Sequence, residues 1–416
     1  MYRKAAIHHS VFGGILGKTF IPSFGTSTSH EYTLQSYEIV YLSAMKKKHL
    51  VIAVTNNLLY DQRVQRISSA LSEEYKVTLV GRSKSGNRGL EAGNIGVDCV
   101  WLPCIFSSGK LFYFEYQIRL FFFLLFLEFD VIYAVDHDTL WGGFGLGWLR
   151  RKARIYDAHE YFEEVPELAG RSFSKKLWSL TGKIWVPTAH LCITVNDALA
   201  DILSQRYKMD FIAICNMPVR RERSTHSVSP PSSPIVLYQG VLNVGRGLPE
   251  MIKALEYLPD TILWLAGEGD LSEELRQQAK ASPVADRIVF HGFVLPDQLH
   301  HLTVKASVGI NLLEGDSLNY VYSLANKFFD YVHAGIPQIS MNYPVYQSFV
   351  DKFNVGILID NIEPENIANA ISHILHPDQY KCYVDACQKA SEIWHWESQV
   401  PILLDAVGLA IENRNH

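Results

Sequence analysis

The chain has 416 residues, a length that exceeds one typical hydrophobic core and suits two domains. Its composition, 48% hydrophobic and 19% charged, excludes a disordered chain, and its net charge of −5 excludes a general attraction to nucleic acid. The six cysteines lack the CxxC spacing of zinc or redox sites, which indicates buried free thiols and fits a reducing cytoplasm.

The first 44 residues differ from the rest of the chain. They show no apolar period and no signal-peptide layout, because no apolar run with a cleavage site follows Arg3 and Lys4. The stretch Met45-Lys46-Lys47-Lys48 then leads directly into an apolar segment, as at the start of many cytosolic α/β proteins. We therefore predict that residues 1–44 are a dispensable leader and that the fold begins at residue 45.

Apolar strand-like runs alternate with helix-like runs over residues 45–218, the pattern of a parallel α/β sheet. Asn196 is expected to cap a helix over 197–207. The expected strands are 50–54, 77–80, 131–135, 154–157, 191–195 and 211–215. These residues form the first predicted Rossmann-like domain.

Residues 219–234 are polar and rich in serine and proline, which is typical of a linker. The alternation then restarts and predicts a second Rossmann-like domain over 235–390, with strands at 235–238, 262–266, 288–290, 308–312 and 338–341. Ligands of such sheets bind beyond the carboxyl ends of the strands. The fold class is therefore α/β, with two Rossmann-like domains facing a cleft.

The most apolar segment is 111–129, which Glu115 and Arg119 interrupt. A membrane span needs about 20 apolar residues, so the segment is not a transmembrane helix. Two interpretations are open. It is either a core helix or a helix that lies against the inner membrane leaflet, near the cationic residues at 150–154.

The strongest candidate site follows the expected strand 308–312. Ser323 is a natural helix N-cap, which would leave the amides of Leu324 and Ala325 free to hold a diphosphate at the positive end of the helix. Asp330, further along the same helix, could accept both hydroxyls of a ribose. The alternative is an ordinary capped helix that ends at Gly335.

A second candidate site is the first βα turn of the second domain. Gly240, Gly245 and Gly247 let the backbone approach a phosphate, and Arg246 supplies a forked cation. Many βα turns contain such glycines, so the pattern alone has low specificity.

A third group of polar residues follows the expected strands of the first domain. His159, after strand 154–157, could reach a substrate hydroxyl or a donor sugar. We expect the remaining members to bind the acceptor: Asn56, Asn57, Asp61, Arg63, Asp136 and His137. A metal site is the alternative, but no HxH or HExxH spacing supports one, so we predict no metal.

Together these segments resemble family 4 of the retaining glycosyltransferases, which have the GT-B fold. The resemblance covers about 48–404 and rests on the order and spacing of short segments. They are Asp61-Gln-Arg63-Val64, Tyr156-Asp157-Ala158-His159-Glu160, Val195-Asn196-Asp197-Ala198, Gly240 with Arg246-Gly247, Ser323-Leu324-x-Asn326-Lys327-x-Phe329-Asp330-Tyr331, Ala334-Gly335-Ile-Pro337 and Trp394-His-Trp396-Glu397.

The resemblance implies roles for individual residues. Arg246 matches the donor-phosphate cation, Asp330 the ribose-binding second acid of the E-x7-E motif, and His159 the histidine near the reacting sugar. Lys327 is expected to assist Arg246. Residues 391–416 are expected to form a helix that crosses back to the first domain. Tyr322 departs from the pattern at the first acid of E-x7-E, where Glu314 or Asp316 could substitute.

The implied reaction moves a sugar from a nucleoside diphosphate to a hydroxyl of a glycan or lipid-linked glycan, with retention and without a metal or other cofactor. Arg246, Lys327 and helix amides would stabilise the departing diphosphate. The expected location is cytoplasmic, with possible peripheral contact with the inner membrane leaflet and no nucleic-acid partner. Two alternatives stay open: a sugar-nucleotide epimerase, and a non-catalytic sugar-nucleotide-binding subunit of a polysaccharide assembly complex.

Overall fold

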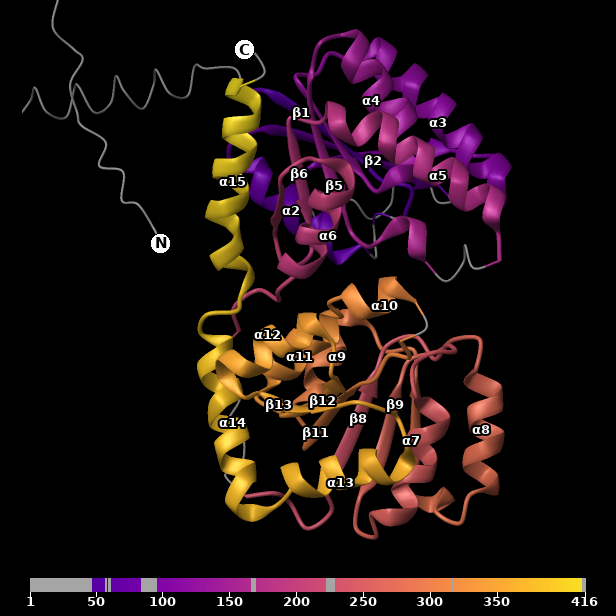
Figure 1. Ribbon diagram of the computed structural model, residues 1–416, viewed down its shortest axis with the longest axis vertical. Helices are drawn as coiled ribbons and strands as arrows, with labels where there is room; N and C mark the ends of the chain where they lie inside the picture. Colours follow the sequence, from indigo (N-terminus) through magenta and orange to yellow (C-terminus); the bar gives the residue numbers. More distant parts are fainter. Residues whose placement is uncertain are drawn as a thin grey trace, which may run out of the picture. The chain divides into compact units, whose positions relative to one another are not determined.

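The computed structural model describes residues 47–56, 58, 61–83, 96–165, 170–221, 229–315 and 317–413. Residues Lys48–His416 form one compact unit, in which two parallel β-sheets are covered by helices (Figure 1). The predicted α/β architecture with two Rossmann-like sheets is thereby confirmed. The leader predicted over 1–44, together with Asn57 and Asp316, lies outside the described residues.

The first sheet has the strand order β3-β2-β1-β4-β5-β6-β7, with every neighbouring pair parallel. From β1 the sheet grows toward β3 on one side, and from β4 it grows toward β7 on the other, so the strand order reverses between β1 and β4. Ligands of such sheets bind beyond the carboxyl ends of the strands at this point. The strands are β1 His49–Ala53, β2 Lys76–Ser83, β3 Asp98–Pro103, β4 Val131–Val135, β5 Ala153–Ala158, β6 Leu191–Thr194 and β7 Phe211–Ala213. The helices are α2 Gln62–Ser72, α3 Gly109–Phe126, α4 Leu140–Leu149, α5 Ser172–Trp185 and α6 Asp197–Tyr207.

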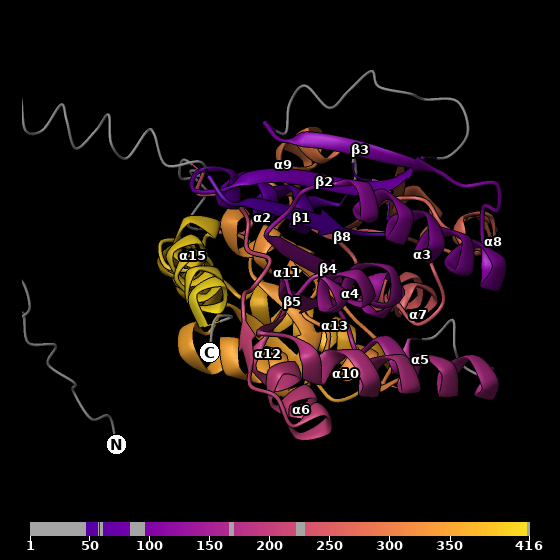
Figure 2. The same ribbon diagram turned by 90° about the horizontal axis from the view of Figure 1, so that it is seen from above.

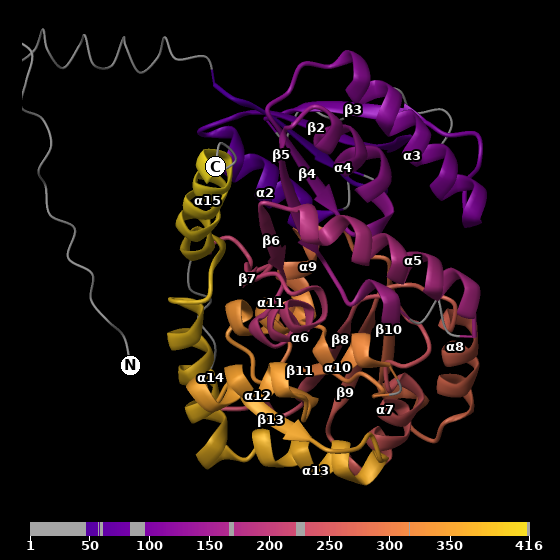
Figure 3. The same ribbon diagram turned by 45° about the horizontal axis from the view of Figure 1, so that its top comes forward.

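Helices cover both faces of this sheet, because successive side chains of a buried strand point to opposite sides. Leu50 and Ile52 of β1 pack with α2, whereas Val51 and Ala53 pack with α3 and α4. Figures 2 and 3 show α2 on one side of the sheet and α3, α4 and α5 on the other. Asn196 caps α6 by accepting a hydrogen bond from the amide of Leu199, as predicted.

The second sheet repeats the arrangement, with the order β10-β9-β8-β11-β12-β13 and parallel pairs throughout. Its strands are β8 Ile235–Gln239, β9 Ile262–Ala266, β10 Ile288–Gly292, β11 Val308–Asn311, β12 Gln338–Met341 and β13 Gly356–Ile359. Its helices are α7 Leu248–Ala254, α8 Ser272–Ala281, α9 Pro296–Thr303, α10 Leu318–Tyr322, α11 Asn326–Ala334, α12 Pro344–Phe353, α13 Pro364–Ile374 and α14 Pro377–Ser391.

The last helix, α15 (Trp396–Glu412), packs on the first sheet although it follows the second in sequence (Figure 1). Its buried residues Trp396, Leu403, Val407 and Ile411 share one hydrophobic cluster with residues of β1, β5 and α2. The amide of Trp396 donates a 2.7 Å hydrogen bond to the carbonyl of Pro218, so the two chain crossings between the sheets lie side by side.

Three features differ from the sequence-based expectations. The edge strands β3 and β13 had no predicted counterpart. The six cysteines are free, but Cys382 is exposed, and Cys99 and Cys104 are only partly buried. Helix α3 buries one side and leaves the other in solvent. In the part of the chain that the structure describes, no helix is both long and apolar enough to span a bilayer.

Candidate functional site

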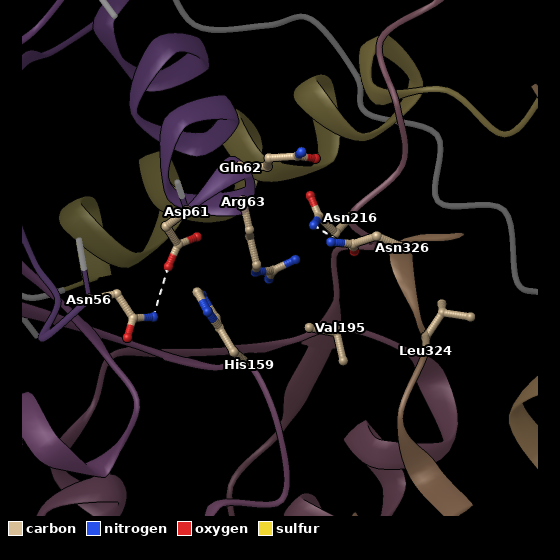
Figure 4. A pocket seen from close by; sticks show the side chains of 9 residues that line it. All are labelled: Asn56, Asp61, Gln62, Arg63, His159, Val195, Asn216, Leu324 and Asn326. Carbon is tan, nitrogen blue, oxygen red and sulfur yellow. Dashed lines mark hydrogen bonds between the residues drawn. The ribbon is translucent and has the colours of Figure 1, made fainter. Parts of the chain in front are cut away.

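A pocket of about 540 Å³ lies between the carboxyl ends of the first sheet and the segment that joins α10 to α11 (Figure 4). Its volume falls in the usual range of small-ligand sites. The lining residues are Asn56, Asp61, Gln62, Arg63, His159, Val195, Asn216, Leu324 and Asn326. The pocket therefore brings together five residues that the sequence assigns to substrate contacts: Asn56, Asp61, Arg63, His159 and Leu324. Their individual roles stay predictions.

Arg63, Asp157 and His159 form a hydrogen-bonded chain at the floor of this pocket. Arg63 donates to both carboxylate oxygens of Asp157, and His159 Nε2 lies 3.1 Å from Oδ2 of the same carboxylate. Burial lowers the pKa of His159, but the charge and hydrogen bond of Asp157 outweigh burial and raise it to about 9. Burial raises the pKa of Asp157, but Arg63 and His159 hold it well below its usual range. The pocket therefore presents an imidazolium at neutral pH.

Asp136 positions the loop that carries His159. Its Oδ1 accepts a 2.9 Å hydrogen bond from the backbone amide of His159. Asp136 itself has φ of +54° and ψ of 177°, a conformation that is costly for a residue with a side chain. The strained residue thus sits at a strand end beside the pocket, where it acts on the His159 backbone and does not line the cavity.

His137 is buried, with 2% of its surface exposed, and is absent from the pocket wall. Its Nδ1 and Nε2 each lie 2.9 Å from a tyrosine hydroxyl, of Tyr156 and Tyr207 respectively, and its ring stacks on Phe162. Burial lowers the pKa of His137 to about 3, so the ring is neutral. This placement favours a role in packing over the acceptor contact expected from the sequence.

Asn56 and Asp61 form another part of the pocket wall. Asn56 Nδ2 donates to Asp61 Oδ2 at 3.1 Å, and Asp61 Oδ1 caps α2 by accepting from the amide of Val64. The side chain of Asp61 is therefore held in place by local hydrogen bonds. Among the described residues, no group of three His, Cys, Asp or Glu side chains is arranged to hold a metal ion.

The glycine turn after β8 approaches a partly buried lysine, Lys327. Gly240 has φ of +132°, and a β-carbon there would lie 3.3 Å from Nζ of Lys327, so a larger residue would crowd the ammonium group. Gly245 and Gly247 also have positive φ, of +82° and +62°. Arg246 lies between these last two glycines, and its charge acts on Lys327.

Arg246 and Lys327 lie close enough for their charges to repel, and the carboxylate of Asp330 only partly offsets this repulsion at Lys327. Lys327 Nζ lies 3.8 Å from the ring centroid of Tyr238, and the Arg246 guanidinium lies 5.2 Å from that of Tyr320. Within the described ranges neither forms an ion pair, and the buried Nε of Arg246 has no hydrogen-bond partner. Burial and then the charge of Arg246 hold the pKa of Lys327 well below its usual range. A bound anion would relieve both penalties.

Asp330 lies on α11, one turn after Lys327. Its Oδ2 accepts a 3.0 Å hydrogen bond from Nε2 of Gln239, whose Oε1 accepts one from the hydroxyl of Thr303. Burial raises the pKa of Asp330 to about 6, although Arg66 and Arg221 oppose the shift. The buried amide–hydroxyl pair thus fixes one carboxylate oxygen of Asp330.

The helix boundaries around Ser323 differ from the prediction. Ser323 ends α10 as its C-cap and does not cap α11, which begins at Asn326 with Ala325 as its N-cap. The amide of Ala325 donates to the hydroxyl of Tyr346 at 3.2 Å, so it is not free for a phosphate. The prediction missed that residues 318–322 form their own short helix. Leu324 nevertheless lines the pocket.

Helix α10 connects the two domains, which the sequence did not indicate. Asn319 Oδ1 accepts from the amide of Tyr161, and Asn319 Nδ2 donates to Glu160. The carbonyl of Tyr322 accepts from Asn196 Nδ2, and its ring packs on the first domain's core. The aromatic residue at the first E-x7-E position is thus part of the domain contact.

The remaining pocket residues, Gln62, Val195, Asn216 and Asn326, had no predicted role. Three of them stand inside or beside the short segments that carry the family resemblance, and this position is the signal that could have found them. Asn216 follows β7 and donates a 2.8 Å hydrogen bond to Asn326 Oδ1, so it was unpredictable without the domain arrangement (Figure 4).

Comparison with known proteins adds a family and a fold. The family model described as "Glycosyl transferases group 1" matches residues 219–391. The lipopolysaccharide core biosynthesis glycosyltransferase LpsE of Rhizobium meliloti (strain 1021) is 25% identical over 147 residues. That match spans 35% of this chain and 41% of the relative, so it covers less than half of either protein.

Two solved structures share the architecture. The crystal structure of Anabaena HepE in complex with UDP and glucose has a TM-score of 0.70 at 14% identity, covering 87% of this chain and 99% of that one. A putative UDP-N-acetylglucosamine 2-epimerase from Listeria monocytogenes has a TM-score of 0.59 at 13% identity, covering 88% and 97%. Such low identities establish the fold alone, and they confirm the GT-B arrangement.

Proposed function

Because residues 219–391 match the family model of the group 1 glycosyl transferases, we propose that this chain transfers a sugar from a nucleoside diphosphate to an acceptor hydroxyl. The proposal includes retention at the anomeric carbon, as the resemblance to family 4 implies. It also includes an acceptor that is a glycan or lipid-linked glycan, in keeping with the name of the LpsE relative. The protein would act in the cytoplasm, at the inner face of the membrane.

The pair formed by Arg246 and Lys327 is the observation that carries this proposal. Two neighbouring cations whose nearby carboxylate, Asp330, offsets their repulsion only in part are unfavourable, and the buried Nε of Arg246 lacks any hydrogen-bond acceptor among the described residues. A diphosphate supplies two negative charges and several acceptor oxygens at this point. Arg246 can bind two of these oxygens through its fork, while Lys327 acts as a point charge.

The same pair suits the chemistry of the transfer. Negative charge grows on the diphosphate as the bond to the sugar breaks, and fixed cations that need no rearrangement stabilise that charge. Asp330, whose Oδ2 accepts a hydrogen bond from Gln239, would accept the ribose hydroxyls. In this mechanism the cations take the place of a metal ion, and the donor is the only nucleotide required.

His159 is proposed to contact the donor sugar from the first domain. Its pKa of about 9 makes it a hydrogen-bond donor at neutral pH, which excludes it as a general base there. Asp157 is occupied by Arg63 and His159, so it is not free to attack the sugar. We therefore assign His159 to positioning a sugar hydroxyl and not to covalent catalysis.

The first test is a thermal-shift screen of UDP, GDP, ADP and their sugars, because a ligand of the folded state raises its apparent stability. UDP-glucose is the first donor to try, since HepE was crystallised with UDP and glucose. Arg246→Met and Lys327→Met should each weaken binding of the active nucleotide by about tenfold or more. Arg276→Met is the matched control, because this partly exposed cation of the same domain pairs with Glu268.

A nucleotide that binds parent and Arg246→Met equally would remove the phosphate assignment. The alternatives have their own signatures. Tyr322 at the first E-x7-E position favours a non-catalytic subunit, for which nucleotide binding without turnover across an acceptor panel is expected. The fold shared with the Listeria monocytogenes protein keeps an epimerase open, and an epimerised sugar nucleotide formed without any acceptor would establish it.

A further inference from the structure

Helix α3 has an apolar stripe that faces solvent. The buried residues of α3 all lie on one side of the helix; they are Phe112, Tyr116, Leu120 and Leu124. The opposite side exposes large hydrophobic residues at intervals of three or four, which align along a helix. They are Leu111 at 58%, Phe114 at 67%, Ile118 at 41%, Phe122 at 54% and Phe126 at 86%.

Helix α5 presents a second stripe of the same kind. Its exposed members are Phe173 at 67%, Leu177 at 46%, Leu180 at 53% and Ile184 at 41%. Tyr113 of α3 and Trp178 of α5 meet edge to face, with ring centroids 5.3 Å apart. Helix α4 also contacts α5, because Trp141 Nε1 of α4 donates a 3.0 Å hydrogen bond to the hydroxyl of Thr181. Figure 3 shows the three helices on one face of the first sheet.

A groove of about 550 Å³ runs between α3 and α5. Its walls include Phe114, Ile118 and Phe122 from α3 and Leu177 and Trp178 from α5. Along α3 the lining extends from residue 109 to 122, which corresponds to about 20 Å of helix. The groove thus extends along α3 and is lined mostly by apolar residues.

Charge is distributed unevenly around this groove. Lys110 and Arg171 both line it, and both belong to the end where α3 and α5 begin. Lys110 Nζ lies 4.9 Å from the ring centroid of Phe173, next to Arg171 in sequence. Helices α3, α4 and α5 contain five Lys or Arg residues and one acidic residue, Glu115, in a chain whose net charge is −5.

We infer that this groove binds the hydrocarbon chain of an anionic amphiphile, with its phosphate between Lys110 and Arg171. A chain of methylenes matches a long apolar groove, and the cations at one end match a single anionic head group. The inference rests on the proposed function and deepens it, because the ligand would be the lipid part of the acceptor. The exposed stripes beside the groove would rest on the membrane from which the lipid enters.

The position of the groove supports this assignment. Trp178, on its wall, packs edge to face on Phe162, with ring centroids 5.2 Å apart. Phe162 follows by three residues His159, which lines the pocket of about 540 Å³. Lys175 of α5 also pairs with Glu164 of this loop at 2.7 Å. A lipid bound along α5 would therefore place its head group near the carboxyl ends of the strands, where His159 also lies.

The test uses the full-length protein and three soluble probes below their micelle-forming concentrations. Dodecyl phosphate has the chain and the charge, dodecyl maltoside has the chain alone, and inorganic phosphate has the charge alone. Calorimetry should show that dodecyl phosphate binds at least tenfold more tightly than either of the others. Equal binding of dodecyl maltoside would overturn the role of the cations, and equal binding of phosphate would overturn the role of the groove.

Matched variants separate the groove from general adsorption. Leu177→Gln should weaken dodecyl phosphate binding about tenfold, whereas Leu180→Gln, on the same stripe outside the groove, should not. The double variant Lys110→Gln/Arg171→Gln should also weaken it about tenfold, with Lys183→Gln as its control. Equal effects of Leu177→Gln and Leu180→Gln would contradict a defined groove.

Two further outcomes would overturn the inference. A ligand-free protein that is dimeric in sedimentation and becomes monomeric with Leu177→Gln would assign the groove to a second copy of the chain. A parent protein that binds none of the probes would leave no lipid site. Donor binding is measured in parallel with UDP-glucose and should be unchanged by Leu177→Gln, so failure of the groove and failure of the proposed transferase function are distinguishable.

Discussion

The guanidinium of Arg63 binds both carboxylate oxygens of Asp157, through Nε at 3.2 Å and Nη2 at 2.8 Å, and neither side chain is more than 4% exposed. The pair links α2 to β5 across 94 residues of sequence. Asp157 also lies within hydrogen-bond distance of His159 Nε2, so the buried ion pair orients a side chain that lines the pocket.

Replacing Arg63 by methionine should destabilise the protein strongly, because it leaves the buried carboxylate of Asp157 without its main partner. The expected loss is about 3–5 kcal/mol of unfolding free energy, measured by urea denaturation. Lys175→Met is the control, since it removes a half-exposed pair with Glu164 and should lose at most about 1 kcal/mol. Similar losses in the two variants would show that burial does not decide the strength of the pair.

The contribution of His159 to stability should depend on pH. Its pKa is raised from 6.5 to about 9 in the folded protein, so the folded state holds the proton more tightly. The stabilisation is complete below pH 6.5 and is lost as pH rises through 9. The melting-temperature difference between parent and His159→Gln should therefore shrink between pH 7 and pH 10. His137→Gln is the control, because His137 stays neutral over this range and its difference should be constant.

Donor affinity should fall in mild acid if Asp330 accepts the ribose hydroxyls. The pKa of this carboxyl is about 6, so binding of UDP-glucose should weaken about tenfold from pH 7 to pH 5 as Asp330 gains a proton. A nucleotide sugar is the correct probe, because its diphosphate has no terminal phosphate that titrates near pH 6. Asp330→Asn should bind more weakly at pH 7 and show a flat profile in calorimetry. An unchanged slope in the variant would assign the titration to another group.

Sugar transfer should persist after chelation, because Arg246 and Lys327 are placed to neutralise the leaving diphosphate. We expect an excess of EDTA to change the initial rate less than twofold. Arg246→Lys should retain part of the activity that Arg246→Met loses, since lysine keeps the charge but not the fork. Activity lost with EDTA and restored by magnesium or manganese would contradict the metal-free mechanism.

Most of the fold could be predicted from the sequence, because buried parallel strands are continuous apolar runs. The strands at 131–135, 262–266 and 338–341 coincide with those observed. The missed strand β3 (Asp98–Pro103) is partly exposed and lacks a uniform apolar run, whereas the missed strand β13 (Gly356–Ile359) is apolar but only four residues long. Edge position alone does not explain the two omissions, because the other edge strands, β7 and β10, were predicted.

The candidate site was less accessible to prediction. Residues at strand ends, such as His159 and Asn56, could be found because their place in a parallel sheet implies a common edge. His137 satisfies the same rule but turns inward to two tyrosines, and only the packing of β5 and α6 reveals this. Asn319 and Asn216 act across the two domains, so their partners depend on the tertiary arrangement.

The packing of α15 on the first sheet has a consequence for biosynthesis. The hydrophobic cluster of β1 and α2 includes Leu403, Val407 and Ile411, which leave the ribosome almost 200 residues after the last strand of that sheet. At about 5–20 residues per second, this face waits on the order of 10–40 s for its cover. Until α15 is made, the nascent first domain therefore exposes an apolar face, which favours aggregation and the binding of chaperones. A chain that stops before residue 396 would keep that face uncovered permanently.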